Sequence, residues 1–363
     1  MINVMFRIFR LRPKKFLGID IGTSSIKIVE IGKRGHTLIL ENYGEVKTSL
    51  TIRKPLQTFG KNDLLLSDQN TAKAIQSVCK EAGIQTKEVN FSIPDFCTFF
   101  TTFEIPAMSE EEIPEAIRYE VRPYVPLPLS EITLDWTVVK GQPSKTPLKV
   151  LVAAIPNEVI SQYQRIAHLS KLKLKILEPE AFALARATVK NKNEKKVIGL
   201  IDIGARSTTC SVLEQGILKT SHSFNIASNH LTERLARSLA IDYNKAEELK
   251  IRYGLTFDEQ VEGSRQSIRK ILVPIVDLIL EEIKKIFRSF YQEEGKEIDK
   301  IILGGGLAFL PGLKEYFFAE LKKETVISNP FLDISYPPVL QKTLEKEGPA
   351  YAVAVGLALK GLE

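Results

Sequence analysis

The chain has 363 residues and a mass of 40.8 kDa, which is enough for roughly two to four domains of ordinary size. Hydrophobic residues make up 44% of it and charged residues 26%, so a disordered or collagen-like chain is excluded. The net charge of +6 is spread thinly along the chain, and we therefore expect no nucleic-acid partner. Three cysteines cannot form a disulfide framework, and neither they nor the four histidines have metal-pair spacing.

The N-terminal segment 1–15 is basic, with five Lys and Arg and no acid. Charges interrupt its apolar residues and no small-residue cleavage site follows, so it is not a signal peptide. We expect a basic leader; the alternative is a short amphipathic segment that contacts an anionic membrane or a partner. The longest uncharged apolar run, Ile301–Leu313, is well short of the about 20 residues of a transmembrane helix. We therefore expect a cytoplasmic protein.

The first strongly patterned segment is Phe16–Ile31, FLGIDIGTSSIKIVEI. An apolar strand ends at Asp20, a Gly-Thr-Ser-Ser turn follows, and apolar residues then resume, which predicts a β-hairpin. Val197–Leu213, VIGLIDIGARSTTCSVL, repeats this pattern 182 residues later. The repeat aligns Asp20 with Asp202, Ile21 with Ile203, Gly22 with Gly204 and Ser25 with Ser207. Two copies of one hairpin half a chain apart indicate a duplicated α/β unit.

Each hairpin has the residue types that bind phosphate and magnesium. A turn of Gly, Ser and Thr presents backbone N–H groups and hydroxyls to an anion. An Asp at the end of a strand can hold Mg²⁺ through water, because Mg²⁺ keeps several of its waters. A single Asp-x-Gly turn is more often an ordinary tight turn, but the repeat favours a ligand site in which two hairpins clamp a polyphosphate.

The segment Phe96–Leu172, between the two hairpins, predicts a βαββα unit. Ser109 and Glu112 form a plausible capping box before its first helix. The expected elements are strands at Thr98–Ile105, Ile132–Val139 and Leu148–Ile155 and helices at Glu110–Glu120 and Glu158–Leu169.

The second half of the chain adds a long helix and a glycine-rich junction. Apolar residues recur every three and four positions over Ser264–Gln292, which predicts an amphipathic helix with a kink at Pro274. Ile301–Leu313, IILGGGLAFLPGL, predicts a buried strand that ends in three glycines before a helix from Pro311. Glycines at such a junction let a flat ligand lie against the backbone.

These motifs resemble those of the actin/Hsp70/sugar-kinase superfamily. IDIGTSS and LIDIGARSTTCSV are similar to its phosphate-1 and phosphate-2 motifs, ILGGGLAFLPGL to its adenosine motif, and Lys175–Ala187, KILEPEAFALARA, to its connecting helix. Within the superfamily the chain most resembles the PilM/FtsA family, whose PilM members serve type IV pilus assembly. That likeness runs from about Phe16 to the C-terminus; besides the total length, its marks are AEELK at Ala246–Lys250, Asn329-Pro330-Phe331 and Tyr351–Leu362.

The resemblance implies an actin-like (ribonuclease H-like) fold, in which two lobes flank a nucleotide cleft. The first lobe would carry the βαββα insertion, called 1C, as an SHS2-type domain. The expected division is a leader at 1–15, domain 1A at 16–95 and 173–195, 1C at 96–172, 2A at 196–225 and 299–363, and 2B at 226–298.

The resemblance also implies ATP and Mg²⁺ as ligands. Mg²⁺ would be organised by Asp20 and Asp202, through water. The β-phosphate would be held by Gly22, Thr23, Ser24 and Ser25, the γ-phosphate by Gly204, Ala205 and Ser207, the ribose and adenine by Glu247 and Lys250, and the other face of the adenine by Gly304, Gly305 and Gly306.

The roles of five further positions are less determined. Lys27 either reaches the phosphates or lies on the surface, and Arg206 either neutralises phosphate charge or points to solvent. Glu178 either orients an attacking water, as the resemblance implies, or serves only as an acid at a helix N-terminus. Relatives usually have Gly-Gly where this chain has Ala227-Ser228, and the two side chains are expected to narrow the approach to the γ-phosphate.

The function that the resemblance implies is an ATP-binding platform for type IV pilus assembly, peripheral to the inner membrane. Its partner would be the N-terminal cytoplasmic peptide of PilN, held in a groove between 1A and 1C, within a complex that includes PilO and PilP. Hydrolysis of ATP would be slow at most, and self-association stays open. The alternatives are an FtsA-like filament protein that tethers a cytoskeleton to membrane, a type II secretion relative, and a sugar or metabolite kinase, for which no catalytic Asp motif is found.

Overall fold

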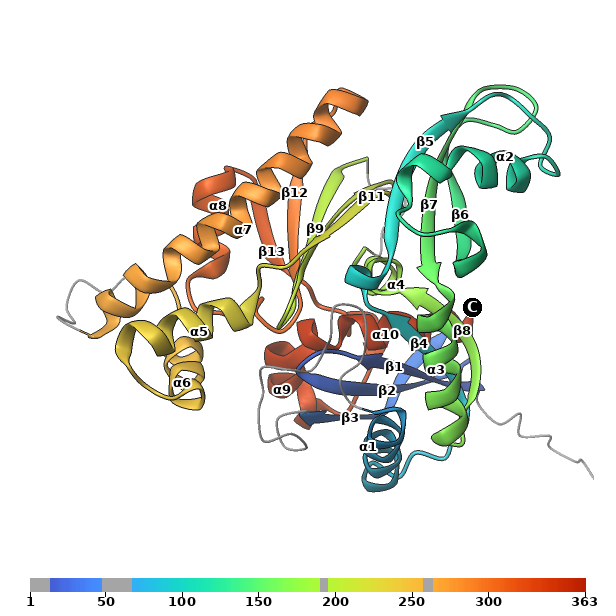
Figure 1. Cartoon of the computed structure of the whole chain (residues 1–363). Coiled ribbons are helices and arrows are strands. Elements are labelled where there is room, and N and C mark those ends of the chain that lie inside the picture. Colours follow the sequence, from blue (N-terminus) through green and yellow to red (C-terminus); the bar gives the residue numbers. More distant parts are fainter. Residues whose placement is uncertain (1–13, 48–66, 190–194, 257–263) are drawn as a thin grey trace, which may run out of the picture.

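Two lobes lie side by side, and a smaller sheet stands above the first of them (Figure 1). The computed structural model describes residues 14–47, 67–189, 195–256 and 264–363, so most of the basic leader lies outside it. Within these ranges the strands form one sheet of six strands, one of five and one of three.

The sheet of the first lobe contains the first hairpin. Its strands are β1 (Lys14–Ile21), β2 (Ser25–Arg34), β3 (Thr37–Lys47), β4 (Glu88–Ile93), β8 (Lys173–Pro179) and β14 (Ile334–Ser335), in the order β14-β3-β2-β1-β4-β8. β1 pairs antiparallel with β2 and parallel with β4, which in turn pairs parallel with β8. β1 is almost entirely buried, as expected of a central strand that is covered on both faces.

The sheet of the second lobe repeats this order. Its strands are β9 (Val197–Ile203), β10 (Thr208–Glu214), β11 (Ile217–Phe224), β12 (Lys300–Gly304) and β13 (Glu324–Ile327), in the order β11-β10-β9-β12-β13. β9 pairs antiparallel with β10 and parallel with β12, as β1 does with β2 and β4. The order β3-β2-β1-β4-β8 thus recurs strand for strand, which confirms the predicted duplication.

The insertion has a small core of its own. Its strands are β5 (Phe99–Ile105), β6 (Ile132–Lys140) and β7 (Leu148–Pro156), in the order β5-β7-β6, and its helix is α2 (Ile113–Glu120). Buried side chains such as Phe103, Ile117 and Val150 pack together between the helix and the sheet. Ser109 donates its N–H and its hydroxyl to the Glu112 carboxylate, but Glu112 is the residue that precedes the helix and no side chain caps it, so the capping box predicted at Ser109 does not form.

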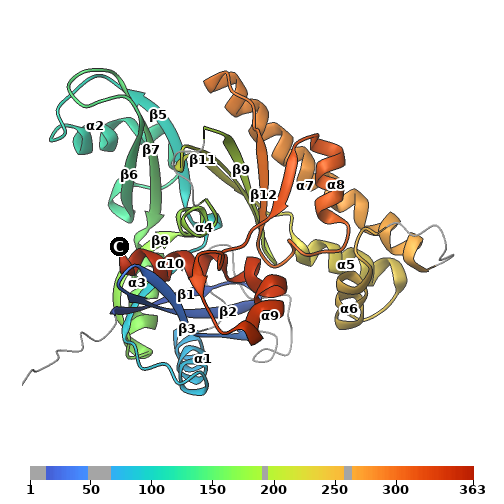
Figure 2. The ribbon, with the colours of Figure 1, turned by 180° about the vertical axis from the view of Figure 1, so that it is seen from behind.

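The last helix predicted for the insertion belongs instead to the first lobe. This helix, α3 (Asn157–Leu169), shares a core with β1, β4 and α1 (Asp68–Glu81) through Val159, Tyr163 and Ile166. Figure 2 shows α3 at the side of the first sheet, with α1 below the sheet and α2 far from both. The apolar face of α3 fits this larger core, so the structure ends the insertion near Pro156 and not at Leu172.

The C-terminal segment also returns to the first lobe, although the sequence placed it in domain 2A. β14 pairs with β3, and α10 (Ala352–Leu362) packs on β1 and on α4 (Glu180–Thr188) between the lobes. Two glycines allow this approach, because a Cβ on Gly18 or on Gly356 would lie 1.9 Å from the carbonyl oxygen of Ala354 or Ala183. Near α10 lie the helix α9 (Gln341–Glu347) and the turn Gly348–Tyr351.

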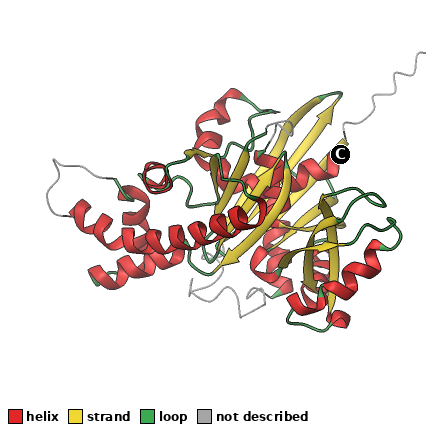
Figure 3. Ribbon diagram, turned by 90° about the horizontal axis from the view of Figure 1, so that it is seen from above, coloured by secondary structure: helices red, strands yellow, loops and turns green. Residues whose placement is uncertain are grey.

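The helices of the second lobe cover its sheet and extend to one side (Figure 3). They are α5 (Ser228–Leu239), α6 (Tyr243–Tyr253), α7 (Ser264–Glu294) and α8 (Leu313–Leu321). α7 is continuous through Pro274 and buries Leu272, Val276, Ile279 and Ile283 in the core of the lobe. Across the described ranges, no helix combines the length and apolar character that a membrane span requires.

Candidate functional site

The two Asp-x-Gly hairpins have the same local geometry. In the β1–β2 turn the Gly22 N–H donates to the Ser25 carbonyl at 3.0 Å, and in the β9–β10 turn the Gly204 N–H donates to the Ser207 carbonyl at 3.0 Å. A Cβ at either glycine would lie 3.1 Å from that carbonyl oxygen, so a side chain would crowd the bond that closes the turn. The repeat in sequence is therefore a repeat in structure.

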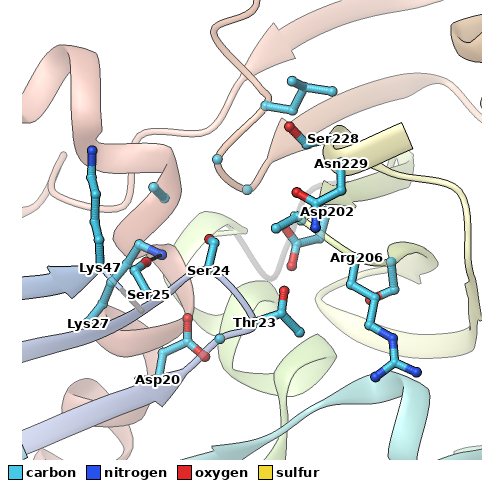
Figure 4. A pocket seen from close by; sticks show the side chains of 18 of the residues that line it. Asp20, Thr23, Ser24, Ser25, Lys27, Lys47, Asp202, Arg206, Ser228 and Asn229 are labelled. Atoms are coloured by element: carbon cyan, nitrogen blue, oxygen red, sulfur yellow. Dashed lines mark hydrogen bonds between the residues drawn. The ribbon is translucent and has the colours of Figure 1, made fainter. Parts of the chain in front are cut away.

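The hairpins line one cavity of about 500 Å³ between the lobes (Figure 4). Thr23 and Ser24 lie at its centre, with Asp20 on one side and Asp202 on the other. Of the predicted residues, the cavity is lined by Asp20, Gly22, Thr23, Ser24, Ser25, Lys27, Asp202, Gly204, Ala205, Ser207, Glu247, Gly305 and Gly306. The remaining wall includes Lys47, Glu180, Ser228, Asn229, Tyr243, Asn244, Ile251, Pro349 and Val353.

Four acidic side chains lie at or close to the floor of this cavity: Asp20, Asp202 and Glu180 line it, and Asp95 is buried next to Glu180. Burial raises the pKa of Asp20, against the opposing effects of Lys27 and of the Ser92 hydroxyl, which donates to Asp20 at 2.8 Å. Burial and the charge of Asp20 raise the pKa of Asp202 to about 6. Burial raises the pKa of Asp95 to about 7, and it raises the pKa of Glu180 well above its usual value, with further contributions from the neighbouring acids. These acids therefore bind protons at higher pH than exposed carboxyl groups do.

Two acids of this group, Asp95 and Glu180, are not among the residues predicted from the sequence; Glu180 lines the cavity and Asp95 is bonded to it. The Asp95 N–H donates to the Glu180 carboxylate at 3.2 Å, and the Ala181 N–H, at the start of α4, donates back to Asp95 at 3.2 Å. A signal for Asp95 was available, since it follows the strand that runs parallel to the Asp20 strand. Carboxyl ends of parallel strands meet at one edge of a sheet.

Glu178, the candidate catalytic acid, does not line the cavity. It lies in β8, where its carboxylate accepts hydrogen bonds from the Arg186 guanidinium of α4; the bond from Arg186 Nη2 is 2.9 Å long. Two residues further on, Glu180 begins α4 and does line the cavity. The structure therefore places Glu180, and not Glu178, on the cavity wall.

Lys250 lies behind the cavity wall and not on it. Its side chain is 1% exposed, and its ammonium donates to Glu247 at 2.7 Å, to Ser228 Oγ at 2.6 Å and to Thr232 Oγ1 at 2.9 Å. Burial lowers the pKa of Lys250, against the effect of Glu247. Lys250 therefore holds Glu247 and Ser228 in place, and of the predicted pair only Glu247 lines the cavity.

The glycine-rich junction contributes two of its three glycines. Gly304 is the last residue of β12 and lies beneath the wall, whereas Gly305 and Gly306 line the cavity. Gly305 has φ +82°, and a Cβ there would lie 2.3 Å from the Asp202 carboxylate. Only glycine allows this close backbone approach to Asp202.

The Ala227-Ser228 pair narrows the cavity less than the sequence indicated. Ala227 is fully buried and does not line it, while Ser228 does, with its hydroxyl held by Lys250. The N–H of Ser228 donates to the Gly204 carbonyl at 3.1 Å, so the start of α5 is attached to the second hairpin.

The basic side chains of the cavity come from both lobes. Lys27 lines it, with its ammonium 2.9 Å from Ser25 Oγ and 3.9 Å from Glu45, so the cavity and not the open surface is its place. Arg206 is part of the lining, but its guanidinium lies over the ring of Phe96, 4.5 Å from the ring centre. Lys47 is the third basic residue that lines the cavity.

Two lobes of one topology, with equivalent hairpins on a shared cavity, define an actin-like protein. The chain belongs to the family of the type IV pilus assembly protein PilM, whose model matches residues 18–362.

Individual relatives agree with this assignment. FtsA of Enterococcus faecalis, a cell division protein, is 23% identical over 94% of this chain and 89% of its own. A solved PilM-PilN type IV pilus biogenesis complex has a TM-score of 0.82 and 24% identity, covering 96% of this chain and 98% of the other. MreB5 of Spiroplasma citri bound to ADP has a TM-score of 0.53 and 14% identity, with 94% of each chain covered. The structural likenesses show the fold.

Proposed function

We propose that this protein binds ATP with Mg²⁺ between its lobes and serves as an actin-like platform for type IV pilus assembly at the cytoplasmic face of the inner membrane. The nucleotide part depends mainly on one observation, the two equivalent hairpins on a single cavity. It is supported by the solved actin-like structure that contains ADP.

The chemistry of the lining fits this ligand. Hard carboxylate oxygens suit Mg²⁺, and Asp20 and Asp202 would hold the ion through water. No three His, Cys, Asp or Glu side chains of the described ranges converge on a direct metal site. Because acids dominate the floor, a bare triphosphate would be repelled, and Mg²⁺ would supply the compensating charge. The hairpin turns would hold the β- and γ-phosphates.

The base end of the ligand would lie between α6 and the glycine-rich junction. Glu247 offers a fixed carboxylate to the ribose, since Lys250 and Thr232 both donate to it. Gly305 and Gly306 leave a flat backbone surface opposite, and Ile251, Pro349 and Val353 add apolar area for a base. Such a site, apolar with a few fixed polar groups, is typical of small-ligand pockets.

Hydrolysis is proposed to be slow. Glu180 is the acid on the cavity wall that could orient a water, but burial and the neighbouring acids raise its pKa well above the usual value, which disfavours the carboxylate form. A protonated carboxyl cannot accept a proton from water. We expect phosphate release far below the median enzyme turnover of about 10 s⁻¹.

A thermal-shift experiment tests the nucleotide part. A ligand that binds only the folded state stabilises it by about 2.7 kcal/mol at 100 times its Kd, so millimolar Mg-ATP should raise the Tm. Asp202→Ala should abolish most of this rise. The proposal fails if the parent protein shows no shift over millimolar Mg-ATP.

For the partner we propose the N-terminal cytoplasmic peptide of a PilN-like membrane protein, held between the first lobe and the insertion, with PilO- and PilP-like proteins in the same complex. The insertion sheet supports this idea because its two edges differ. β5 lies beside β11 of the second lobe, with the Thr102 hydroxyl 3.3 Å from the Lys219 carbonyl. β6, at the other edge, pairs only with β7 among the described strands. Near its end the Val139 carbonyl accepts from Lys219 of β11, so a peptide could add as a further strand beside the part of β6 before Val139.

Tryptophan fluorescence can test this site without any mutation. Trp136 is the only tryptophan of the sequence, and it lies half-buried on β6. A synthetic N-terminal peptide of the PilN-like protein should change the intrinsic emission in a saturable way, and a scrambled peptide should not. Binding of the peptide with unchanged emission would place the site elsewhere.

A further inference from the structure

The residues 94–98 form a turn, here called the 94–98 turn, that joins the first lobe to the insertion. β4 ends before it and β5 begins after it. Its own hydrogen bonds run from Cys97 N–H to the Pro94 carbonyl at 2.9 Å and from Thr98 N–H to the Asp95 carbonyl at 3.0 Å. Asp95 also ties the turn to α4. The turn is therefore a firm base for the insertion.

The same turn lies on the wall of the cavity. Pro94 and Phe96 both line it, and the ring of Phe96 lies under the guanidinium of Arg206, 4.5 Å from the carbon of that group. Figure 4 shows the Arg206 side chain extending away from Asp202 and Thr23, toward the ribbon that leads into the insertion. Arg206 itself belongs to the second hairpin of the other lobe. One side chain thus connects a phosphate-binding turn of one lobe with the base of the insertion on the other.

The contact of Arg206 with Phe96 and a contact of Arg206 with phosphate differ in strength. A guanidinium over a partly exposed aromatic ring is held weakly, whereas a guanidinium on a phosphate forms bidentate, charge-assisted hydrogen bonds. Arg206 is part of the hairpin that would face the γ-phosphate, and its backbone therefore lies next to the place where the second contact would form.

Resting on the proposed nucleotide site, we propose that Arg206 senses the terminal phosphate. With ATP and Mg²⁺ its guanidinium leaves Phe96 and binds the γ-phosphate; with ADP it stays on Phe96. The 94–98 turn then differs between the two nucleotide states, and the insertion, which begins directly after it, differs with it. Departure of the guanidinium uncovers Phe96, while Phe100 remains against Phe182 of α4 at 6.1 Å between ring centres.

Affinities for ATP and ADP, measured by calorimetry with Mg²⁺, test this proposal. Arg206→Ala should raise the Kd for ATP about tenfold or more and leave the Kd for ADP within about twofold, because only the γ-phosphate contact is lost. Phe96→Leu should act in the opposite direction and lower the Kd for ATP about two- to fivefold, since it removes the competing ring. Arg122→Ala is the matched control, as Arg122 lies over Tyr119 at 5.4 Å within the insertion, and it should change neither value.

Hydrogen exchange provides a readout on the insertion itself. Amides over residues 94–105 should exchange at different rates in the ATP and ADP states of the parent protein, and the difference should vanish in Arg206→Ala. Equal weakening of ATP and ADP by Arg206→Ala, or no weakening, would overturn the proposal, as would identical exchange of this segment in both states. If neither nucleotide binds the parent protein, the proposed nucleotide site itself is wrong. If both nucleotides bind but Arg206→Ala does not discriminate between them, only the role of Arg206 is wrong.

Discussion

At the scale of single residues, the acids at the cavity floor act on stability as well as on binding. The pKa of Asp95 is about 7 in the folded chain, against an ordinary value of 3.8, and the main cause is burial. The folded protein therefore binds a proton in a pH range where the unfolded chain has already lost it. Unfolding releases that proton, so the free energy of unfolding falls as pH rises from about 4 to about 7.

This linkage predicts that Asp95→Asn stabilises the nucleotide-free protein at pH 8. Asparagine keeps the acceptor for the Ala181 N–H and removes the buried charge, so we expect a gain of about 1–4 kcal/mol at pH 8 and little change at pH 5. Urea unfolding at both pH values measures it. Glu120→Gln, on the exposed side of α2, is the control and should show no such pH dependence. A gain of the same size at both pH values would contradict the assignment to Asp95 titration.

The two glutamates around Pro179 should separate in function. Glu180→Gln changes the cavity wall, so it should alter Mg-ATP affinity or phosphate release by several-fold. Glu178→Gln breaks the partly buried pair with Arg186, so it should cost about 1–3 kcal/mol of stability and leave nucleotide affinity within about twofold. Calorimetric titration and urea unfolding of both variants check this. The opposite pattern would restore Glu178 to the site.

At the scale of elements, α10 depends on two glycine contacts with its neighbours. A Cβ on Gly356 would lie 1.9 Å from the carbonyl oxygen of Ala183. This oxygen belongs to the backbone, which cannot move aside as a flexible side chain can. We therefore expect Gly356→Ala to destabilise the fold by about 2–3 kcal/mol, as overpacking does. Gly306→Ala is the control for unfolding experiments, because no atom lies within 4 Å of its Cβ. Equal denaturant midpoints for the two variants would refute this account of the α10 contacts.

The elements also show which parts of the fold could be predicted from the sequence. Both hairpins were predictable because their signal is local: an apolar strand, an Asp, and a turn led by Gly22 or Gly204. The place of α3 and of β14 was not, because an amphipathic helix or a two-residue strand fits either of two cores until tertiary contacts decide.

The site follows the same division. Residues within the hairpins were found, as were Glu247 and two of the three glycines at 304–306. Asp95 and Glu180 were not predicted because only the tertiary structure brings them together beside the cavity, and Glu178 was favoured because a motif gives the order of residues and not the side to which each one points. Lys250 shows the same limit. The predicted helix face was right, because Lys250 pairs with Glu247, but its side chain is buried behind the cavity wall and does not line it.

At the scale of the whole molecule, the insertion is joined to the second lobe by an ion pair above the cavity. The Lys149 ammonium of β7 lies 2.5 Å from the Glu294 carboxylate at the end of α7, and their side chains are only 14% and 10% exposed. The Lys219 ammonium of β11 donates to the Val139 carbonyl of β6 at 2.7 Å. These contacts join the lobes at a second place, away from α4 and α10.

Lys149→Met should weaken this connection. It leaves the Glu294 carboxylate with more distant cations, such as Lys140 at 3.8 Å, so we expect a loss of about 2–3 kcal/mol and faster hydrogen exchange in β5 and β7. Lys323→Met breaks a more exposed pair with Glu297 and should cost no more than about 1 kcal/mol. Equal losses in the two variants would mean that the Lys149 pair does not join the lobes.

The central claim is that the duplicated hairpins bind a single Mg-nucleotide between the lobes. Isothermal titration of ATP tests it most directly, with Mg²⁺ and then with excess EDTA, on the parent protein and on Asp20→Asn and Asp202→Asn. We predict one ATP per chain in Mg²⁺, much weaker binding in EDTA, and a loss of at least tenfold in each variant, because one aspartate from each lobe is needed. Binding that ignores Mg²⁺, or that survives both substitutions unchanged, would contradict the account.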